Sequence, residues 1–138
     1  MKNLLIALVA LFTGEAQASN ILYQQSYASD FQVSARHELV IRGKNDGADI
    51  ATVVVRIDDA KSKDYASRIN EEWVVKPGPF TLHLPVASFQ TARKRKLDLA
   101  ALTSLTIFTP ATDIHVLDVQ WQTGVAVAPD VLALDFGP

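Results

Sequence analysis

The chain has 138 residues and no cysteine, which excludes disulfide cross-links and thiolate chemistry. It carries 13 Lys and Arg against 15 Asp and Glu, whereas a nucleic-acid-binding protein normally has a concentrated basic face. The length is that of one domain with one hydrophobic core.

The first eighteen residues have the layout of a secretory signal peptide. Lys2 provides a basic start, residues 3–12 (NLLIALVALF) are apolar, and residues 16–18 (AQA) form a small-x-small cleavage site. The apolar run is about half the ~20 residues that a membrane-spanning helix needs. No later apolar stretch is long enough to cross a bilayer. We therefore expect a soluble mature chain, secreted or periplasmic, that begins at Ser19 and has no membrane contact.

Short apolar segments then recur between turn residues. Residues 43–47 (GKNDG) and 76–79 (KPGP) are typical of turns, and residues 97–102 (LDLAAL) predict one or two helical turns with Asp98 as the N-cap. Strands are predicted at 21–27, 38–42, 51–58, 68–75, 80–84, 105–109 and 114–121.

Two of these strands alternate clearly between apolar and polar residues. The side chains expected on the core face are Val53, Val55 and Ile57 in one strand and Phe80, Leu82 and Leu84 in the other. No segment after residue 18 keeps a helical period over eleven residues. The pattern therefore predicts an all-β fold, an antiparallel β-sandwich over residues 19–123.

The character of the chain changes after this domain. Residues 124–129 (GVAVAP) are small and end in proline, which is typical of a linker, and residues 131–136 (VLALDF) begin another strand. We therefore expect residues 124–138 to contain a linker and the start of a following domain.

Residues 76–121 resemble the second half of a galactose-binding-like jelly roll of the type appended to secreted polysaccharide-degrading enzymes such as agarases. The matching pieces are PGPFTLHLP at 77–85, LDL at 97–99, Leu102, Leu105, Ile107-Phe108 and VLDVQW at 116–121. The tail LALDFGP (132–138) is similar to the opening of a second sandwich in such enzymes. The resemblance implies a non-catalytic accessory module of a larger carbohydrate-active protein, with a glycoside hydrolase as the missing downstream part.

Catalytic patterns are weak in this chain. His37, His83 and His115 are far apart in sequence, and no serine sits in a Gly-x-Ser-x-Gly elbow. Glu71 and Glu72 are adjacent, so on a strand they point to opposite faces and cannot flank one glycosidic bond. We therefore expect no enzyme activity from these residues.

Galactose-binding-like sandwiches often hold a structural calcium ion, and the resemblance implies Asp118 as a candidate ligand. Carboxylates and backbone carbonyls are the hard oxygen ligands that calcium prefers. The Asp-x-Asp-x-Asp-Gly pattern is absent, however. No other cofactor is expected.

Sugar binding needs an exposed aromatic face and nearby groups that bind hydroxyls. The candidates are Trp73 and Tyr65, with Arg56 and Arg68 as polar partners. Trp73 faces outward if Val74 faces inward, and otherwise belongs to the core. The basic run 93–96 (RKRK) is either a solvated loop or a contact for an anionic polymer.

The expected partner is a polysaccharide, bound by a monomer. The alternative is a structural domain that packs on a neighbouring catalytic domain without binding sugar. Exposed aromatics near Arg56 or Arg68 in one groove favour sugar binding, whereas burial of both Trp73 and Tyr65 favours the structural alternative.

Overall fold

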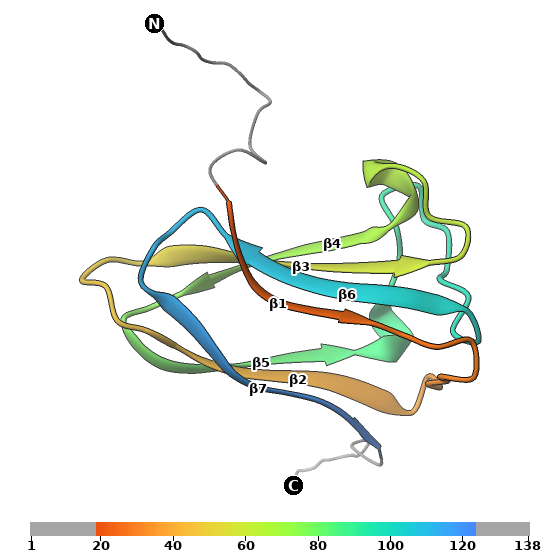
Figure 1. Cartoon of the computed structure of the whole chain (residues 1–138), viewed down its shortest axis with the longest axis horizontal. Helices are drawn as coiled ribbons and strands as arrows, with labels where there is room; N and C mark the ends of the chain where they lie inside the picture. The colour runs from red at the N-terminus through yellow and green to blue at the C-terminus, as the bar shows by residue number, and fades with distance from the viewer. Residues whose placement is uncertain (1–18, 124–138) are drawn as a thin grey trace, which may run out of the picture.

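The computed structural model describes residues 19–123, which form two antiparallel sheets in two layers (Figure 1). The four-stranded sheet has the order β1-β6-β3-β4, and the three-stranded sheet has the order β5-β2-β7. The strands are β1 (Asn20–Ser26), β2 (His37–Asn45), β3 (Ala51–Asp59), β4 (Ile69–Val75), β5 (Gly78–Pro85), β6 (Leu102–Thr109) and β7 (Ile114–Thr123).

Two short 3₁₀-helices, η3 (Tyr65–Ser67) and η4 (Val86–Ser88), are the helical elements in this part of the chain. The predicted all-β class is confirmed, and each of the seven predicted strands is present. Within residues 19–123, no helix has the length and apolarity needed to span a bilayer. The predicted signal peptide, linker and following strand lie outside the described residues.

The alternating pattern places the core between the sheets. Val53, Val55 and Ile57 are fully buried on the inner face of β3, as predicted. On β5, Leu82 and Leu84 are buried and Phe80 is half-buried against the same core. Side chains of one parity face the opposite sheet because the strand period is two residues.

The predicted turns at 43–47 and 76–79 are shorter in the structure. β2 continues to Asn45 and pairs with β5 from Gly78 onward, so that Gly43 lies opposite Phe80. A Cβ at Gly43 would meet the Phe80 ring and lie 2.5 Å from the His115 carbonyl oxygen. Glycine is thus required here because the Phe80 ring occupies the place of its side chain.

The predicted helical turns at residues 97–102 are wrong. Ala101 donates its N–H to the Asp98 carbonyl oxygen (3.0 Å), which closes a single turn, and Leu102 begins β6. The Asp98 carboxylate does accept the Ala100 N–H (3.1 Å), as a capping residue does. Leu97 is buried in the core, so this segment enters β6 as a loop and does not extend as a helix.

An aromatic cluster closes the edge between the sheets near the end of β7. Trp121 lies edge-on to Tyr27 and Phe89 and tilted against Phe31, and it packs against the core. Its indole N–H donates to the Tyr27 hydroxyl (3.0 Å). Burial raises the pKa of Tyr27 to about 12, although the hydrogen bond from Trp121 by itself lowers this pKa.

Candidate functional site

Three of the four predicted binding residues lie at one end of the outer face of the four-stranded sheet. Arg56 on β3 has the opposite parity to the buried Val55 and Ile57, and it pairs in register with Asn70 on β4. Arg68 lies two residues before Asn70 and therefore has the same parity. Tyr65 is the first residue of η3, the short helix just before this end of β4, which we call the Tyr65 turn.

Tyr65 is held outward by a reciprocal cap. The Ser67 N–H donates to the Asp64 carboxylate (3.0 Å), and the Asp64 N–H donates to the Ser67 hydroxyl (3.0 Å). Such a capping box satisfies two backbone donors and fixes a short helix that has few bonds of its own. The Tyr65 side chain projects from this fixed turn and is 62% exposed.

Asn70 connects the predicted residues to one another. Its side-chain oxygen accepts a hydrogen bond from Arg56 Nε (3.3 Å), and its side-chain nitrogen donates to the Tyr65 carbonyl oxygen (3.2 Å). Arg56 also lies over the Phe108 ring, 4.8 Å from its centre, in a cation–π contact. Asn70 thereby uses its amide to join β3 to the Tyr65 turn.

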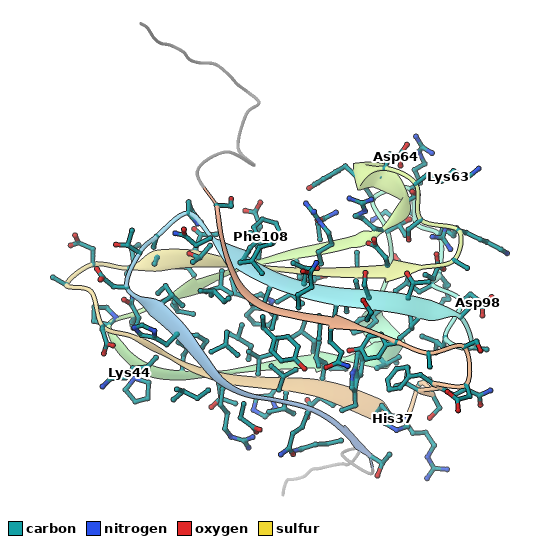
Figure 2. The ribbon with its side chains drawn as sticks, in the orientation of Figure 1. His37, Lys44, Lys63, Asp64, Asp98 and Phe108 are labelled. Carbon is teal, nitrogen blue, oxygen red and sulfur yellow. The ribbon has the colours of Figure 1, made fainter. Side chains whose placement is uncertain are left out.

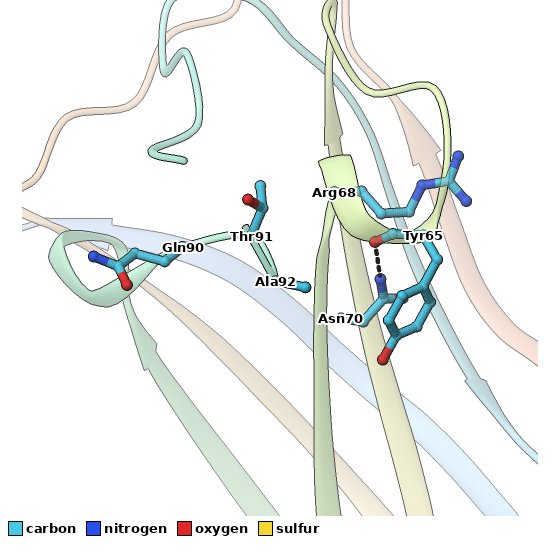
Figure 3. Close-up of a pocket in the computed structure, with 6 residues that line it drawn as sticks. All are labelled: Tyr65, Arg68, Asn70, Gln90, Thr91 and Ala92. Carbon is cyan, nitrogen blue, oxygen red and sulfur yellow. Dashed lines mark hydrogen bonds between the residues drawn. The ribbon is translucent and has the colours of Figure 1, made fainter. Parts of the chain in front are cut away.

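A shallow hollow of about 110 Å³ lies beside this group, between the Tyr65 turn and the loop that follows η4 (Figure 3). We call it the Tyr65 hollow. In Figure 3 the Arg68 side chain extends away from the loop residues, and it pairs with Asp58 at 3.2 Å. The lining residues are Tyr65, Arg68, Asn70, Gln90, Thr91 and Ala92.

The loop that follows η4 forms the other side of the hollow, and an ion pair that the sequence analysis missed anchors it. The Arg95 guanidinium binds the Asp59 carboxylate with two bonds, at 2.7 and 3.1 Å, and also donates to the Ser67 carbonyl oxygen at 2.5 Å. The Asp59 side chain is fully buried. Arg95 therefore connects the loop to the end of β3 and to the Tyr65 turn at once.

Asp59 also accepts bonds from the Asp98 N–H (2.8 Å), the Lys61 N–H (3.0 Å) and the Ser62 hydroxyl (3.1 Å). Burial alone raises the pKa of this carboxyl group. The bonds from Arg95 and from these three donors outweigh burial and lower the pKa of Asp59 to about 2.

This lowered pKa predicts loss of stability in acid. The unfolded carboxyl group, with a pKa of 3.8, takes up its proton while the folded group stays ionised down to about pH 2. The stabilisation is complete above about pH 5 and is lost progressively as the pH falls, mostly between about pH 4 and pH 2. We expect the urea midpoint to fall over this window, and to fall less for Asp59→Asn. If the urea midpoint of Asp59→Asn fell as steeply with pH as that of the unmodified protein, the lowered pKa would not belong to Asp59.

The remaining predicted residues lie apart from the Tyr65 hollow. Trp73 packs against the core and its indole nitrogen is buried, while Val74 is 66% exposed on the outer face. Asp118 lies on β7 in the other sheet and pairs with Arg42 at 3.3 Å. Neither Trp73 nor Asp118 lines the hollow.

The histidines are engaged in separate small contacts. His83 lies 3.2 Å from Glu38, and His115 lies 3.3 Å from Asp46. His37 Nδ1 accepts the Ser34 N–H at 2.9 Å within a turn. Over residues 19–123, no group of three or more His, Cys, Asp or Glu residues could hold a metal ion.

The sequence analysis missed four residues of the site, Asn70, Gln90, Thr91 and Asp59, and it named Arg95 only as one member of the basic run 93–96. Asn70 could have been found, because it shares parity with Arg68 on a predicted strand. Nothing in the run RKRK distinguishes Arg95 from its neighbours, because its partner is 36 residues away.

The hollow offers an aromatic face, amide groups and a backbone loop, which suit a polar ring-shaped ligand. Comparisons of this chain with known protein families, with curated proteins and with solved structures find no match.

Proposed function

We propose that this chain is a secreted, non-catalytic accessory module that binds polysaccharide and belongs to a larger carbohydrate-active protein. The observation that carries the proposal is the exposed Tyr65 ring at the edge of a hollow that also holds Asn70 and Gln90. The C–H face of a pyranose stacks on an aromatic ring, and amide side chains bind its hydroxyl groups.

The proposal includes a jelly roll of the galactose-binding-like type. Two findings support it: the strand order, in which every connection except β3–β4 crosses from one sheet to the other, and the sequence resemblance over residues 76–121. Export to the periplasm or the medium is proposed from the signal-peptide pattern of residues 1–18.

Removal of the Tyr65 ring tests the proposed function. We expect Tyr65→Ala to lose about 1–3 kcal/mol of polysaccharide binding with an unchanged unfolding midpoint, since the ring is exposed and stacks only on ligand. Affinity electrophoresis of the full mature chain in gels containing agar, alginate, pectin or xylan measures this loss.

The matched control is Leu117→Ala, because Leu117 is 69% exposed on β7 in the other sheet. It removes a large exposed side chain far from the hollow and should leave retardation unchanged. Retardation that is equal in Tyr65→Ala and the unmodified protein would rule out Tyr65 as the stacking residue. Failure of every polymer to retard the unmodified protein would rule out the proposed function.

A second candidate function is structural packing on a neighbouring catalytic domain. It is favoured by apolar residues that share the outer face of the four-stranded sheet, where Ile21 and Val54 both pair with Phe108 in register. Ile21 is 63% exposed and Val74, on the same face, is 66% exposed. An exposed apolar group of this kind is typical of a protein interface.

A further inference from the structure

Positive charge is concentrated around the Tyr65 hollow, although the whole chain carries a net charge of −2. The two segments that flank the hollow, residues 58–68 and 90–98, contain seven Lys and Arg against four Asp, a local excess of three positive charges. In Figure 2, Lys63 and Asp64 lie at this end of the sandwich, whereas Lys44 lies at the opposite end. The opposite end carries Asp46, Asp49 and Asp113 in its loops.

Ion pairs within the protein neutralise only part of this positive charge. Arg95 is bound to Asp59, and Arg68 to Asp58. Arg93 is 3.9 Å from Asp64, and both side chains are more than half exposed, so that pair is weak. Within the described residues no ion pair involves the remaining cations of the two segments, Lys61, Lys63, Lys94 and Lys96.

The basic loop, residues 93–96, is held in one conformation by its own hydrogen bonds. The Thr91 N–H donates to the Arg95 carbonyl oxygen (3.0 Å), and the Lys94 N–H donates to the Thr91 carbonyl oxygen (2.9 Å). The buried Thr91 hydroxyl accepts the Arg95 N–H (3.1 Å). Lys94 adopts a left-handed φ of 65° within this turn.

This arrangement gives the members of the RKRK run different roles. Arg95 points inward and fixes the loop, while Arg93, Lys94 and Lys96 are exposed beside the hollow. Cationic side chains on a fixed loop lose less conformational freedom on binding than they would on a mobile segment. The loop is therefore preorganised for a negatively charged ligand.

We infer that the ligand of the Tyr65 hollow is an anionic polysaccharide, whose sugar rings carry carboxylate or sulfate groups. The inference rests on the proposed function and adds the substrate class. One sugar ring stacks on Tyr65, and the acidic group on that ring or the next one binds Arg93 and Lys94. The exposed Arg93–Asp64 pair opens at little cost when the anion arrives.

The experiment measures binding of the full mature chain to polymers of different charge. Polygalacturonate and alginate supply carboxylates, dextran sulfate supplies sulfates, agarose and dextran are the neutral polymers, and polyglutamate is an anionic polymer without sugar. We expect one or both of the anionic sugar classes to bind tightest, and their affinity to fall as the salt concentration rises. The carboxylate and sulfate polymers identify which acidic group is recognised.

The variant for this test is Arg93→Gln/Lys94→Gln, with Lys44→Gln/Lys76→Gln as the control. Each removes two positive charges and one exposed ion pair, since Lys44 pairs with Asp46 at 3.2 Å, but the control changes the opposite end of the sandwich. We expect the removal of two exposed charge contacts to lower the affinity about two- to thirtyfold. We expect that loss in the first variant only, with equal unfolding midpoints in both.

Several outcomes overturn the inference while leaving the proposed function standing. Neutral polymers that bind as tightly as anionic ones, or an equal loss in the control variant, would show that the loop charges do not select the ligand. Polyglutamate binding equal to that of the anionic sugars would show simple ion exchange. Absence of binding to every polymer would instead refute the proposed function itself.

Discussion

Arg95→Ala is expected to lower the free energy of unfolding by about 3 kcal/mol, because it leaves the Asp59 carboxylate buried without its cation. The Asp59 side chain has no exposed surface, and Arg95 supplies two of its bonds. The three other donors to Asp59 remain in the variant, so we expect the lower end of the range known for broken buried pairs. Urea unfolding monitored by tryptophan fluorescence measures the change.

Arg93→Ala is the matched control for this prediction. It removes an arginine two positions away in the same loop, one that is 69% exposed and lies 3.9 Å from its partner. Such exposed pairs contribute about 0–1 kcal/mol. Equal destabilisation by the two variants would show that the loop is not anchored through Asp59. The comparison thus separates the inward-pointing arginine from the exposed one.

Leu82→Ala is expected to lower the free energy of unfolding by about 2–5 kcal/mol. Leu82 is 5% exposed on the inner face of β5, where it belongs to the core between the sheets. The substitution removes buried apolar atoms and leaves a cavity that the neighbours fill only in part. Chemical denaturation of the purified variant gives the value.

Thr81→Ala provides the comparison on the same strand. Thr81 precedes Leu82 and is exposed on the outer face of the sheet, so we expect a change of less than about 1 kcal/mol. If Thr81→Ala destabilised the protein as much as Leu82→Ala, the assigned parity of β5 would be wrong. Neither substitution touches the Tyr65 hollow, so ligand binding should be retained in both.

Prediction from sequence was most successful for the strands and the core. β3 is an example, because its alternating Val53, Val55 and Ile57 identified both the strand and its buried face. A strand has a period of two residues, so burial on one side leaves a local signal. Trp73 had no such clear signal, since apolar Val74 and Val75 follow it. The structure places Trp73 against the core and leaves Val74 exposed.

The loops were predicted less well, because contacts with distant parts of the chain decide their conformation. LDLAAL has good helix formers and a capping aspartate, but Leu97 is buried in the core and Leu102 joins β6. Tertiary packing overrides helix propensity in so short a segment. Likewise Gly43 and Gly78 suggested turns, yet both lie in the paired strands β2 and β5.

The sequence by itself determined the all-β class, the seven strands and the core residues, because each depends on neighbours within a few positions. Only the tertiary structure decided that Tyr65 and Arg68 share a hollow with Gln90 and Thr91, which come from a loop more than 20 residues away. It also decided that Arg95 points inward while Arg93 stays exposed. Both features depend on the position of Asp59 at the end of β3. A buried carboxylate needs a cationic partner, and that partner can lie far away along the chain.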